Sequence, residues 1–417
     1  MSEDRRASEE PAPGEDGDAA SPSRAELFAG ALLLRGGPLA GLVVLTVVVC
    51  AAVLLPAGLW RPSVALPMIA VGLVPAVRIA ARVSAGPVPV LSAAVSLALA
   101  GGYALWAGLT HAEHVVLQRD PGSYALYAQW IATRHSLPVT SHLEAFGGAA
   151  ALDVPGFTLG SPAYYQVLDG QGAQVVPQFL PGTPALLSLG WWAGHWQGLL
   201  LVPSLVGGLV VLAAAGLAAR LVGARWAPFA AALFAVCFPV LHAVRSTYSE
   251  GPALLLVLTA ASLAVDAARR RERSWALLAG TVLGCAGLVR VDSLTEVALL
   301  LPVCTVLALR RDPVGVPLAA GAVAGTVLSG AVALHLSRPY LESIRGSLLP
   351  LVAGTVVLAL ACGLVAVVGV LRARRRPGPA PGGEPDADRG AAERGHRWIG
   401  SAVARRAPRA ASGLVWL

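Results

Sequence analysis

Residues 250–273 read EGPALLLVLTAASLAVDAARRRER, an apolar run that ends in a cluster of arginines. The apolar part, 250–268, is close to the ~20 residues that a helix needs to cross a bilayer. Arg269, Arg270 and Arg271 follow at once, and such basic clusters mark the cytoplasmic end of a transmembrane helix. This segment therefore predicts a membrane-spanning helix and its direction across the membrane.

Similar apolar runs recur along most of the 417-residue chain. Hydrophobic residue types make up 56% of it and charged types only 13%, whereas a soluble domain carries about 25% charge. The runs of spanning length are 38–59, 63–81, 87–109, 197–219, 226–243, 250–268, 275–290, 293–309, 315–336 and 348–371. We therefore expect an all-α polytopic membrane protein with about ten transmembrane helices.

The positive charge of the chain follows the same pattern. The formal net charge is +7, every basic residue other than histidine is arginine, and the arginines stand at the ends of apolar runs. Such placement follows the positive-inside rule and does not build a surface that would face a nucleic-acid groove. We therefore expect membrane lipid around the protein and no nucleic-acid partner. The abundance of Ala, Gly, Pro and Val indicates a GC-rich, bacterial gene, and thus a bacterial plasma membrane.

The arginine clusters give one consistent topology. The cytoplasmic connections are 78–82, 220–225, 269–273 and 310–311. Residues 110–196 then form a single long extracytoplasmic loop, within which the apolar run 180–195 is too short for a usual span. We interpret that run as an interfacial or re-entrant helix. The transmembrane domain is expected over 27–371, between cytoplasmic tails at 1–26 and 372–417 whose composition is typical of disorder.

The long loop contains a helical pattern at 118–138, QRDPGSYALYAQWIATRHSLP. Asp120 before Pro121 suits the N-cap of an amphipathic helix lying at the membrane surface. Asp120 either serves only as that cap, or it is a carboxylate held at the membrane boundary and able to act as a general base. Arg119 and Tyr124 stand beside it and are candidate substrate-binding residues.

The connection RSTYSE at 245–250 lies on the same side of the membrane. Ser249 is a plausible N-cap for the helix that follows, and the positive end of that helix beside Arg245 suits a phosphate. The alternative is that Arg245 only reaches the lipid headgroups. Tyr248 and Glu250 are further candidates, Glu250 because it is able to pair with Arg245 or to hold an acceptor or a metal.

Two more connections carry charge to this side. In VRVDS at 289–293, Arg290 and Asp292 either pair with each other and fix the turn, or Arg290 binds a phosphate. The last outer connection contains a group that is able to contact a lipid phosphate or anionic headgroups: His335, Arg338, Tyr340 and Arg345.

Metal-ligating patterns are weak in this sequence. The five cysteines lie inside apolar runs without a CxxC pair, which argues against a zinc site or a disulfide framework. His111 and His114, with Glu113 between them, are the nearest approach to a ligand set. We expect no cofactor, and a divalent metal stays open.

The order of these motifs resembles the C superfamily of membrane glycosyltransferases (GT-C), which use polyprenyl-phosphate sugars. The resemblance covers residues 87–310. It rests on RDPGSY at 119–124 with RHSLP after it, then on FLPGTPALLSLGWWAG, ARLVGAR, RSTYSEGPALLL and GCAGLVRVDSL in that order. That superfamily includes protein O-mannosyltransferases and bacterial aminoarabinose transferases, and within it the chain most resembles actinobacterial family-39-like membrane proteins.

The resemblance implies roles for several residues. Asp120 matches the acidic residue of the first outer loop and would deprotonate or orient the acceptor. Arg245 and Arg290 would bind the phosphate of a polyprenyl-phosphate sugar, and the acceptor would be a glycan, a glycolipid or a protein. Many relatives have Asp-Glu where this chain has Asp120-Pro121, and many have further spans or an outer C-terminal domain.

Two other classes of function stay open at this stage. One is a transporter or flippase, although such proteins often show internal repeats, and this sequence shows none. The other is a non-catalytic relative of the glycosyltransferases. Of these three classes of function, we expect that the protein is a glycosyltransferase.

Overall fold

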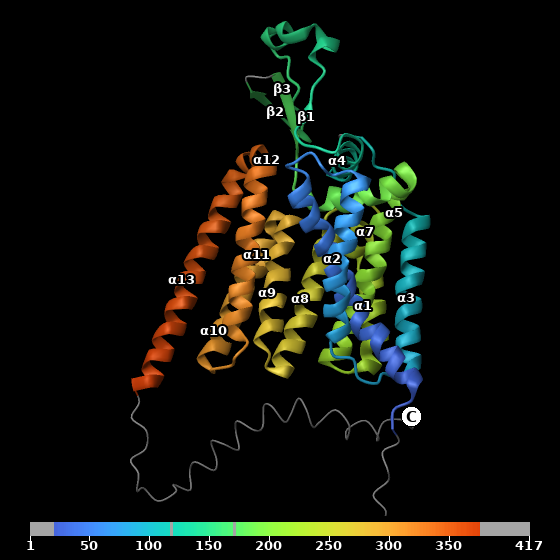
Figure 1. Cartoon of the computed structure of the whole chain (residues 1–417), viewed down its shortest axis with the longest axis vertical. Helices are drawn as coiled ribbons and strands as arrows, with labels where there is room; N and C mark the ends of the chain where they lie inside the picture. The colour runs from blue at the N-terminus through green and yellow to red at the C-terminus, as the bar shows by residue number, and fades with distance from the viewer. Residues whose placement is uncertain (1–20, 117–119, 170–171, 376–417) are drawn as a thin grey trace, which may run out of the picture.

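The computed structural model describes residues 21–116, 120–169 and 172–375. Its helices stand side by side in one bundle, and a small lobe with strands rises from one end of that bundle (Figure 1). Long apolar helices make up the bundle, and strands are few. The expected all-α polytopic membrane fold is therefore confirmed.

Eight helices in the described residues are long and apolar enough to cross a membrane. They include α1 (Arg24–Leu54), α2 (Pro62–Arg82), α3 (Val90–Leu109), α5 (Gly182–Leu221), α8 (Glu250–Arg270), α11 (Gly315–Leu336) and α13 (Arg345–Arg375). The eighth joins the turn η5 (Val291–Ser293) to α10 (Leu294–Leu309). The expected number of about ten spans, counted by length, is thus higher than the number of long helices.

The two remaining runs explain the difference. The run 226–243 forms α6 (Ala227–Val236) and α7 (Phe238–Val244), which are bent by 66° and make a ninth span if they cross together. Pro239 stands in the first turn of α7 and has no N–H for the preceding turn, which accounts for the break. The run 275–290 forms α9 (Arg273–Cys285) and the 3-10 turn η4 (Ala286–Leu288), which together are shorter than a usual span.

The first and the last helix of the bundle both extend into the tails that the sequence predicted to be disordered. Helix α1 begins before residue 27, and Ser23 closes its first turn with a reciprocal capping box. Helix α13 likewise continues past residue 372 to Arg375. Residues 1–20 and 376–417, the rest of the two tails, lie outside the described residues.

Helix α1 also runs through Pro38, at which the first span was expected to start. Pro38 has no N–H to donate to the carbonyl of Leu34, four residues earlier. The guanidinium of Arg220, on α5, donates to that carbonyl instead. A contact from a distant helix therefore replaces the missing backbone hydrogen bond.

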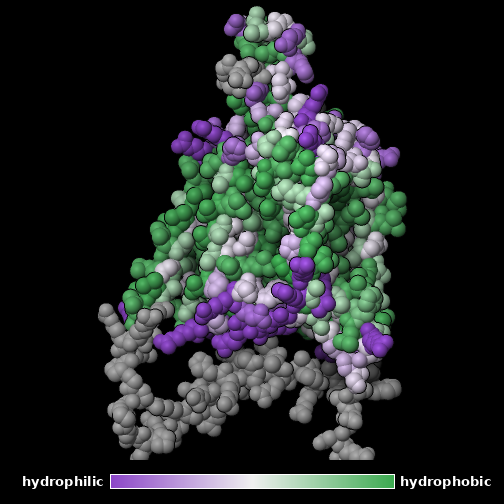
Figure 2. All heavy atoms as spheres, in the orientation of Figure 1, coloured by the Kyte–Doolittle hydropathy of each residue, from purple (hydrophilic) through white to green (hydrophobic). Residues whose placement is uncertain are grey.

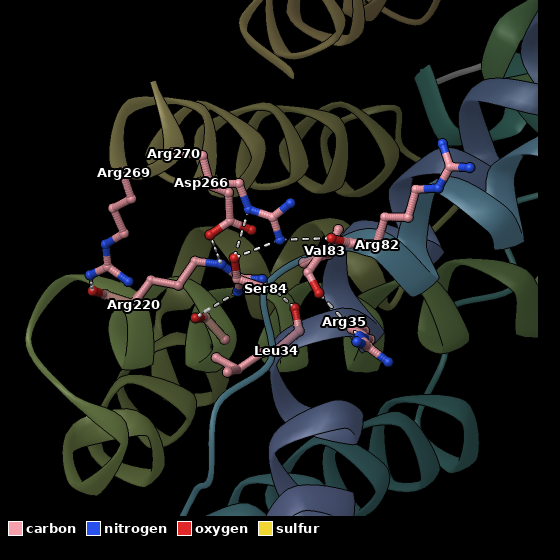
Figure 3. A network of polar contacts seen from close by, with 10 residues as sticks. Leu34, Arg35, Arg82, Val83, Ser84, Arg220, Asp266, Arg269 and Arg270 are labelled. Carbon is pink, nitrogen blue, oxygen red and sulfur yellow. Dashed lines mark hydrogen bonds and ion pairs between the residues drawn. The ribbon is translucent and has the colours of Figure 1, made fainter. Parts of the chain in front are cut away.

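Figure 3 shows the polar network around Arg220. Its Nε lies 3.4 Å from Asp266 Oδ1 of α8, and the two side chains are only 2% and 1% exposed. Arg220 also donates to the carbonyl of Gly216 at 3.0 Å, and Arg269 donates to the carbonyl of Arg220. This buried ion pair joins α1, α5 and α8 inside the apolar bundle.

The apolar run 180–195 forms the first arm of α5. The helix is broken at Gly194 and His195, whose backbone angles are not helical. Beyond the break the second arm folds back against the first. The two arms are so close that a Cβ on Gly190 would lie 2.4 Å from the carbonyl oxygen of Gly198. The run is therefore a short arm separate from the spanning part of the helix, as an interfacial or re-entrant helix would be.

The lobe was not predicted. It contains an antiparallel sheet with strand order β1-β3-β2, formed by β1 (Val139–Thr140), β2 (Tyr164–Asp169) and β3 (Gly172–Pro177). Two 3-10 helices, η1 (Leu143–Phe146) and η2 (Gly148–Asp153), lie between β1 and β2. The long loop therefore carries a folded lobe beside the predicted helix α4 (Asp120–Arg134).

The two ends of the bundle differ in character. The end with the lobe, α4 and α12 (Arg338–Ser343) is called the lobe face, and the opposite end is called the arginine face. The arginine face carries the connections α8–α9 and α10–α11, whose basic residues are Arg269, Arg270, Arg271, Arg273, Arg310 and Arg311. Figure 2 shows an apolar belt between hydrophilic residues at both ends, which is the surface expected of a membrane protein.

Candidate functional site

A polar cavity of about 280 Å³ opens on the lobe face. It is lined by Asp120, Tyr124, Phe179, Leu180, Tyr248, Ser249, Glu250, Val289, Arg290, Val291, Asp292 and Tyr340. These residues come from α4, the segment before α5, the start of α8, the η4–η5 turn and α12. The tertiary structure thus brings together six residues that the sequence singled out: Asp120, Tyr124, Tyr248, Glu250, Arg290 and Asp292.

Helix α4 places Asp120 at the mouth of this cavity. Asp120 is exposed and is the first residue of the helix, whereas the sequence predicted that it caps a helix starting at Pro121. The side-chain hydroxyl of Thr247 donates to the carbonyl of Pro121 and ties this helix start to the segment before α8. Gly122 lets the chain approach closely, since a Cβ there would lie 1.9 Å from the carbonyl oxygen of Val116.

The inner face of α4 is buried against both arms of α5. Tyr124 is 5% exposed and Tyr127 is 1% exposed. The packed cluster consists of Tyr124, Ala125, Ala128, Leu187, Leu199 and Leu200. The predicted helical spacing of these aromatic residues is thus confirmed, and it fixes the orientation of the helix that carries Asp120.

Ser249 lies at the centre of the polar contacts of the cavity. Its hydroxyl oxygen accepts a hydrogen bond from the Tyr124 hydroxyl at 3.0 Å and one from Arg290 Nη1 at 3.1 Å. Burial raises the pKa of Tyr124 well above its ordinary value, although the Ser249 hydrogen bond and the charge of Arg290 oppose this shift. Ser249 is the N-cap residue of α8, as predicted, but its side chain makes no cap hydrogen bond to that helix.

Arg290 is the cation that lines the cavity. Its Nε and Nη2 donate to the two carboxylate oxygens of Asp292 at 2.9 and 2.7 Å, and its Nη1 lies 2.6 Å from Glu250 Oε1. Hydrogen bonding to Asp292, together with the charge of Glu250, raises the pKa of Arg290 against the opposing effect of burial. The predicted Arg–Asp pair is therefore present, and the guanidinium faces the cavity at the same time.

Phe179 and Tyr340 form an aromatic wall of the cavity, and of these two only Tyr340 was named from the sequence, as a residue of the last outer connection. The Phe179 ring stacks on Tyr124 with centroids 4.4 Å apart and meets Tyr340 edge-on at 5.5 Å. Burial raises the pKa of Tyr340 to about 12. Phe179 has φ of +77°, in the left-handed region that non-glycine residues adopt only uncommonly. The Ser337 hydroxyl donates to its carbonyl at 3.0 Å and holds this conformation.

Two predicted site residues, Arg245 and Arg338, do not line the cavity. Arg245 donates to the carbonyl of Thr110 and lies over the ring of Trp106 at 5.3 Å, so it stabilises the carboxyl end of α3. Arg338 is exposed and pairs with Glu342 of its own helix. Arg119 lies outside the described residues. The expectation that Arg245 shares one cavity with Asp120 and Arg290 is therefore wrong.

Two other cavities adjoin the polar one. A cavity of about 330 Å³ reaches beneath the bent α6–α7 pair and shares Glu250, Arg290 and Asp292 with it. It also contains Glu296, which has one buried carboxylate oxygen without a hydrogen-bond partner in the described residues. An apolar groove of about 470 Å³ runs between α10, α11 and α13 and shares Val291 with the polar cavity.

The described residues contain no group of three or more His, Cys, Asp or Glu side chains that is arranged to hold a metal ion. No protein-family model matches the chain, and no curated protein matches it significantly. What this site does must therefore be argued from its chemistry.

Proposed function

We propose that this protein is an integral membrane glycosyltransferase that moves a sugar from a polyprenyl-phosphate donor to an acceptor. The observation that carries this proposal is the junction at Val291, where the polar cavity meets the apolar groove. A polar head with a long isoprenoid chain fits such a pair of adjoining cavities, because each half finds matching walls. The ordered motifs that resemble GT-C enzymes support the same class.

The side chains suit the reaction. The acceptor hydroxyl bonds to the anomeric carbon, the bond from that carbon to the phosphate oxygen breaks, and Asp120 takes the acceptor proton. Arg290 neutralises the charge that develops on the leaving phosphate. Asp292 holds the guanidinium in place, while the phosphate competes with Glu250 for Nη1.

The cavity itself limits how the donor binds. Among the described residues, three carboxylates, those of Asp120, Glu250 and Asp292, line it together with one guanidinium. A phosphate therefore enters a site with an excess of negative charge, and it must displace Glu250 or bring a cation or a proton with it. We expect donor binding to strengthen when divalent cations are added, with the metal held by the donor phosphate as well as by the protein.

The orientation follows from the charges at the two faces. With the arginine face in the cytoplasm, the positive-inside rule is obeyed and the polar cavity opens outside the plasma membrane. The N-terminal and C-terminal ends of the bundle, α1 at Arg24 and α13 at Arg375, then lie on the cytoplasmic side. Cysteine labelling from either side of the membrane would test this assignment.

A second candidate function is the flipping or transport of a lipid-linked substrate. The bent α6–α7 pair lies against a cavity that shares three charged residues with the site, and broken helices are frequent at transport sites. Flipping of a lipid-linked sugar in proteoliposomes, without a glycosyl product, would favour this function over glycosyl transfer.

The test of the enzyme is a pair of matched variants in a deletion strain of the source organism. Asp120→Asn removes the general base and keeps the size of the side chain, and Glu144→Gln removes a carboxylate in the lobe, outside the cavity. We expect the wild type and Glu144→Gln to restore the missing glycan. Asp120→Asn should insert normally and lower transfer by about 10²–10⁴-fold. Full restoration by Asp120→Asn would refute the role of Asp120.

A further inference from the structure

Helix α13 is the least packed of the long helices, and its C-terminal end borders a cavity on the arginine face. Only 6% of its most apolar window is buried, and in Figure 1 it leans away from the rest of the bundle toward that face. Near that end it touches α10 closely, since a Cβ on Gly369 would lie 2.1 Å from the Leu309 side chain. The cavity beside this contact measures about 720 Å³.

This cavity has one basic and one apolar part. It is lined by Arg273, Ala308, Arg311, Asp312, Pro313, Val316, Pro317, Ala366, Val367 and Leu371. The apolar side chains are open to whatever fills the cavity, because Val316 is 65% exposed and Val367 is 57% exposed. An occupant therefore needs a hydrocarbon part for these walls and an anionic part for the arginines.

The two arginines are available to bind an anion. Within the described residues, neither the Arg273 side chain nor the Arg311 side chain makes a hydrogen bond or an ion pair, whereas the side chain of the neighbouring Arg270 binds Ser84 and Glu272. Among the described residues, Asp312 is the one acidic residue of the cavity, and it accepts a hydrogen bond from the Val314 N–H at 3.1 Å that closes its own turn. Arg273, Arg311 and Asp312 together give a formal excess of one positive charge.

We propose that this cavity binds one anionic phospholipid, with the phosphate between Arg273 and Arg311 and an acyl chain against α11 and α13. Its position fits a lipid, because the arginines lie at the end of the apolar belt, where headgroups reside. A soluble anion would match the arginines but leave the apolar walls in water. A zwitterionic lipid would match the walls but bring no net charge. The bound lipid fills the space between α13 and the bundle.

The test is native mass spectrometry of the full-length protein in detergent, titrated with phosphatidylglycerol or with phosphatidylcholine. We expect one tightly held phosphatidylglycerol per chain and clearly weaker phosphatidylcholine. In Arg273→Gln/Arg311→Gln, affinity for phosphatidylglycerol should fall about thirty-fold, which corresponds to about 2 kcal/mol. Raising the salt concentration should weaken the wild type toward the level of the variant.

The control variant is Arg78→Gln/Arg225→Gln. It removes the same charge from exposed arginines that face the same side of the bundle but do not line the cavity. Affinity within about two-fold of the wild type is expected there. Equal loss in both double variants, equal binding of the two lipids, or displacement by millimolar inorganic phosphate would each overturn the proposal. If the first double variant does not fold, the comparison of the two lipids on the wild type still decides the matter.

Discussion

The buried pair between Arg220 and Asp266 gives the sharpest test of how this bundle is held together (Figure 3). Asp266→Ala removes the only carboxylate within reach of Arg220 among the described residues. The guanidinium would then stay among apolar helices without a counter-charge. Breaking one partner of such a buried pair destabilises a protein by about 3–5 kcal/mol.

Replacing both partners separates the charge effect from the hydrogen-bond effect. In Arg220→Met/Asp266→Leu no charge stays buried, so the electrostatic cost should largely disappear. The carbonyl of Leu34 still loses its donor, because Pro38 has no N–H to replace it. An unsatisfied buried carbonyl costs about 1–3 kcal/mol. Adding Pro38→Ala to the double variant restores a backbone N–H, and we expect most of that cost to be recovered.

The assay is the free energy of unfolding of the purified protein, measured by titrating mixed micelles with SDS and following far-UV circular dichroism. Glu272→Ala serves as the control, because its pair with Arg270 is exposed at 3.9 Å. Such surface pairs contribute about 0–1 kcal/mol. A loss below about 1 kcal/mol for Asp266→Ala would refute the reasoning. So would a Pro38→Ala substitution that fails to stabilise the double variant.

Three other predictions follow from the site and the helix packing. Burial raises the pKa values of Tyr124 and Tyr340, the latter to about 12, so these hydroxyls lose their protons at a lower pH in the unfolded chain than in the folded one. Thermal stability should therefore hold below about pH 10 and fall as the pH rises to 12. Gly321→Ala places a Cβ 2.1 Å from the carbonyl oxygen of Leu277 and should lower the free energy of unfolding by about 1–3 kcal/mol, whereas an unchanged value would show that α9 and α11 separate easily. Arg290→Lys keeps the charge but loses the paired hydrogen bonds, so sugar transfer in membranes should drop about 10²-fold; unchanged transfer would remove Arg290 from the mechanism.

The candidate site was predictable only in part. Asp120 and Arg290 were identified because charged residues are rare near apolar runs and therefore conspicuous, and Tyr124 because it follows Asp120 in a helical pattern. Phe179 was missed because an aromatic residue next to an apolar run is ordinary in a membrane protein. The contacts of Phe179 with Tyr124 and with Tyr340 become visible only when three distant segments meet.

The prediction that Arg245 binds the phosphate also failed for a physical reason. In the sequence it stands beside the start of a helix, which suggested a phosphate site. In the structure its guanidinium meets the carbonyl of Thr110, where α3 ends with unpaired backbone acceptors. The carboxyl end of a helix attracts a cation as surely as the amino end attracts an anion. Which helix end an arginine reaches is set by packing and not by its neighbours in the chain.

The strands of the lobe were missed for a different reason, since their signal is in the sequence. Asp169-Gly170 stands between YYQVL at 164–168 and AQVVP at 173–177, and an Asp-Gly pair between β-rich runs is typical of a hairpin. Strands β2 and β3 pair across this position as antiparallel neighbours. The expectation of a purely helical loop outweighed that signal.

The membrane class, the helical architecture and the placement of the arginine clusters on the face opposite the polar cavity follow from the sequence alone. These properties depend on the length and charge of single segments, and each segment carries them alone. The tertiary structure alone decided that α1 continues through Pro38 and that α5 folds back at Gly194. It also decided that Asp120 and Arg290 face one cavity. Each of these depends on a partner far along the chain, such as Arg220 for the carbonyl of Leu34, 186 residues away.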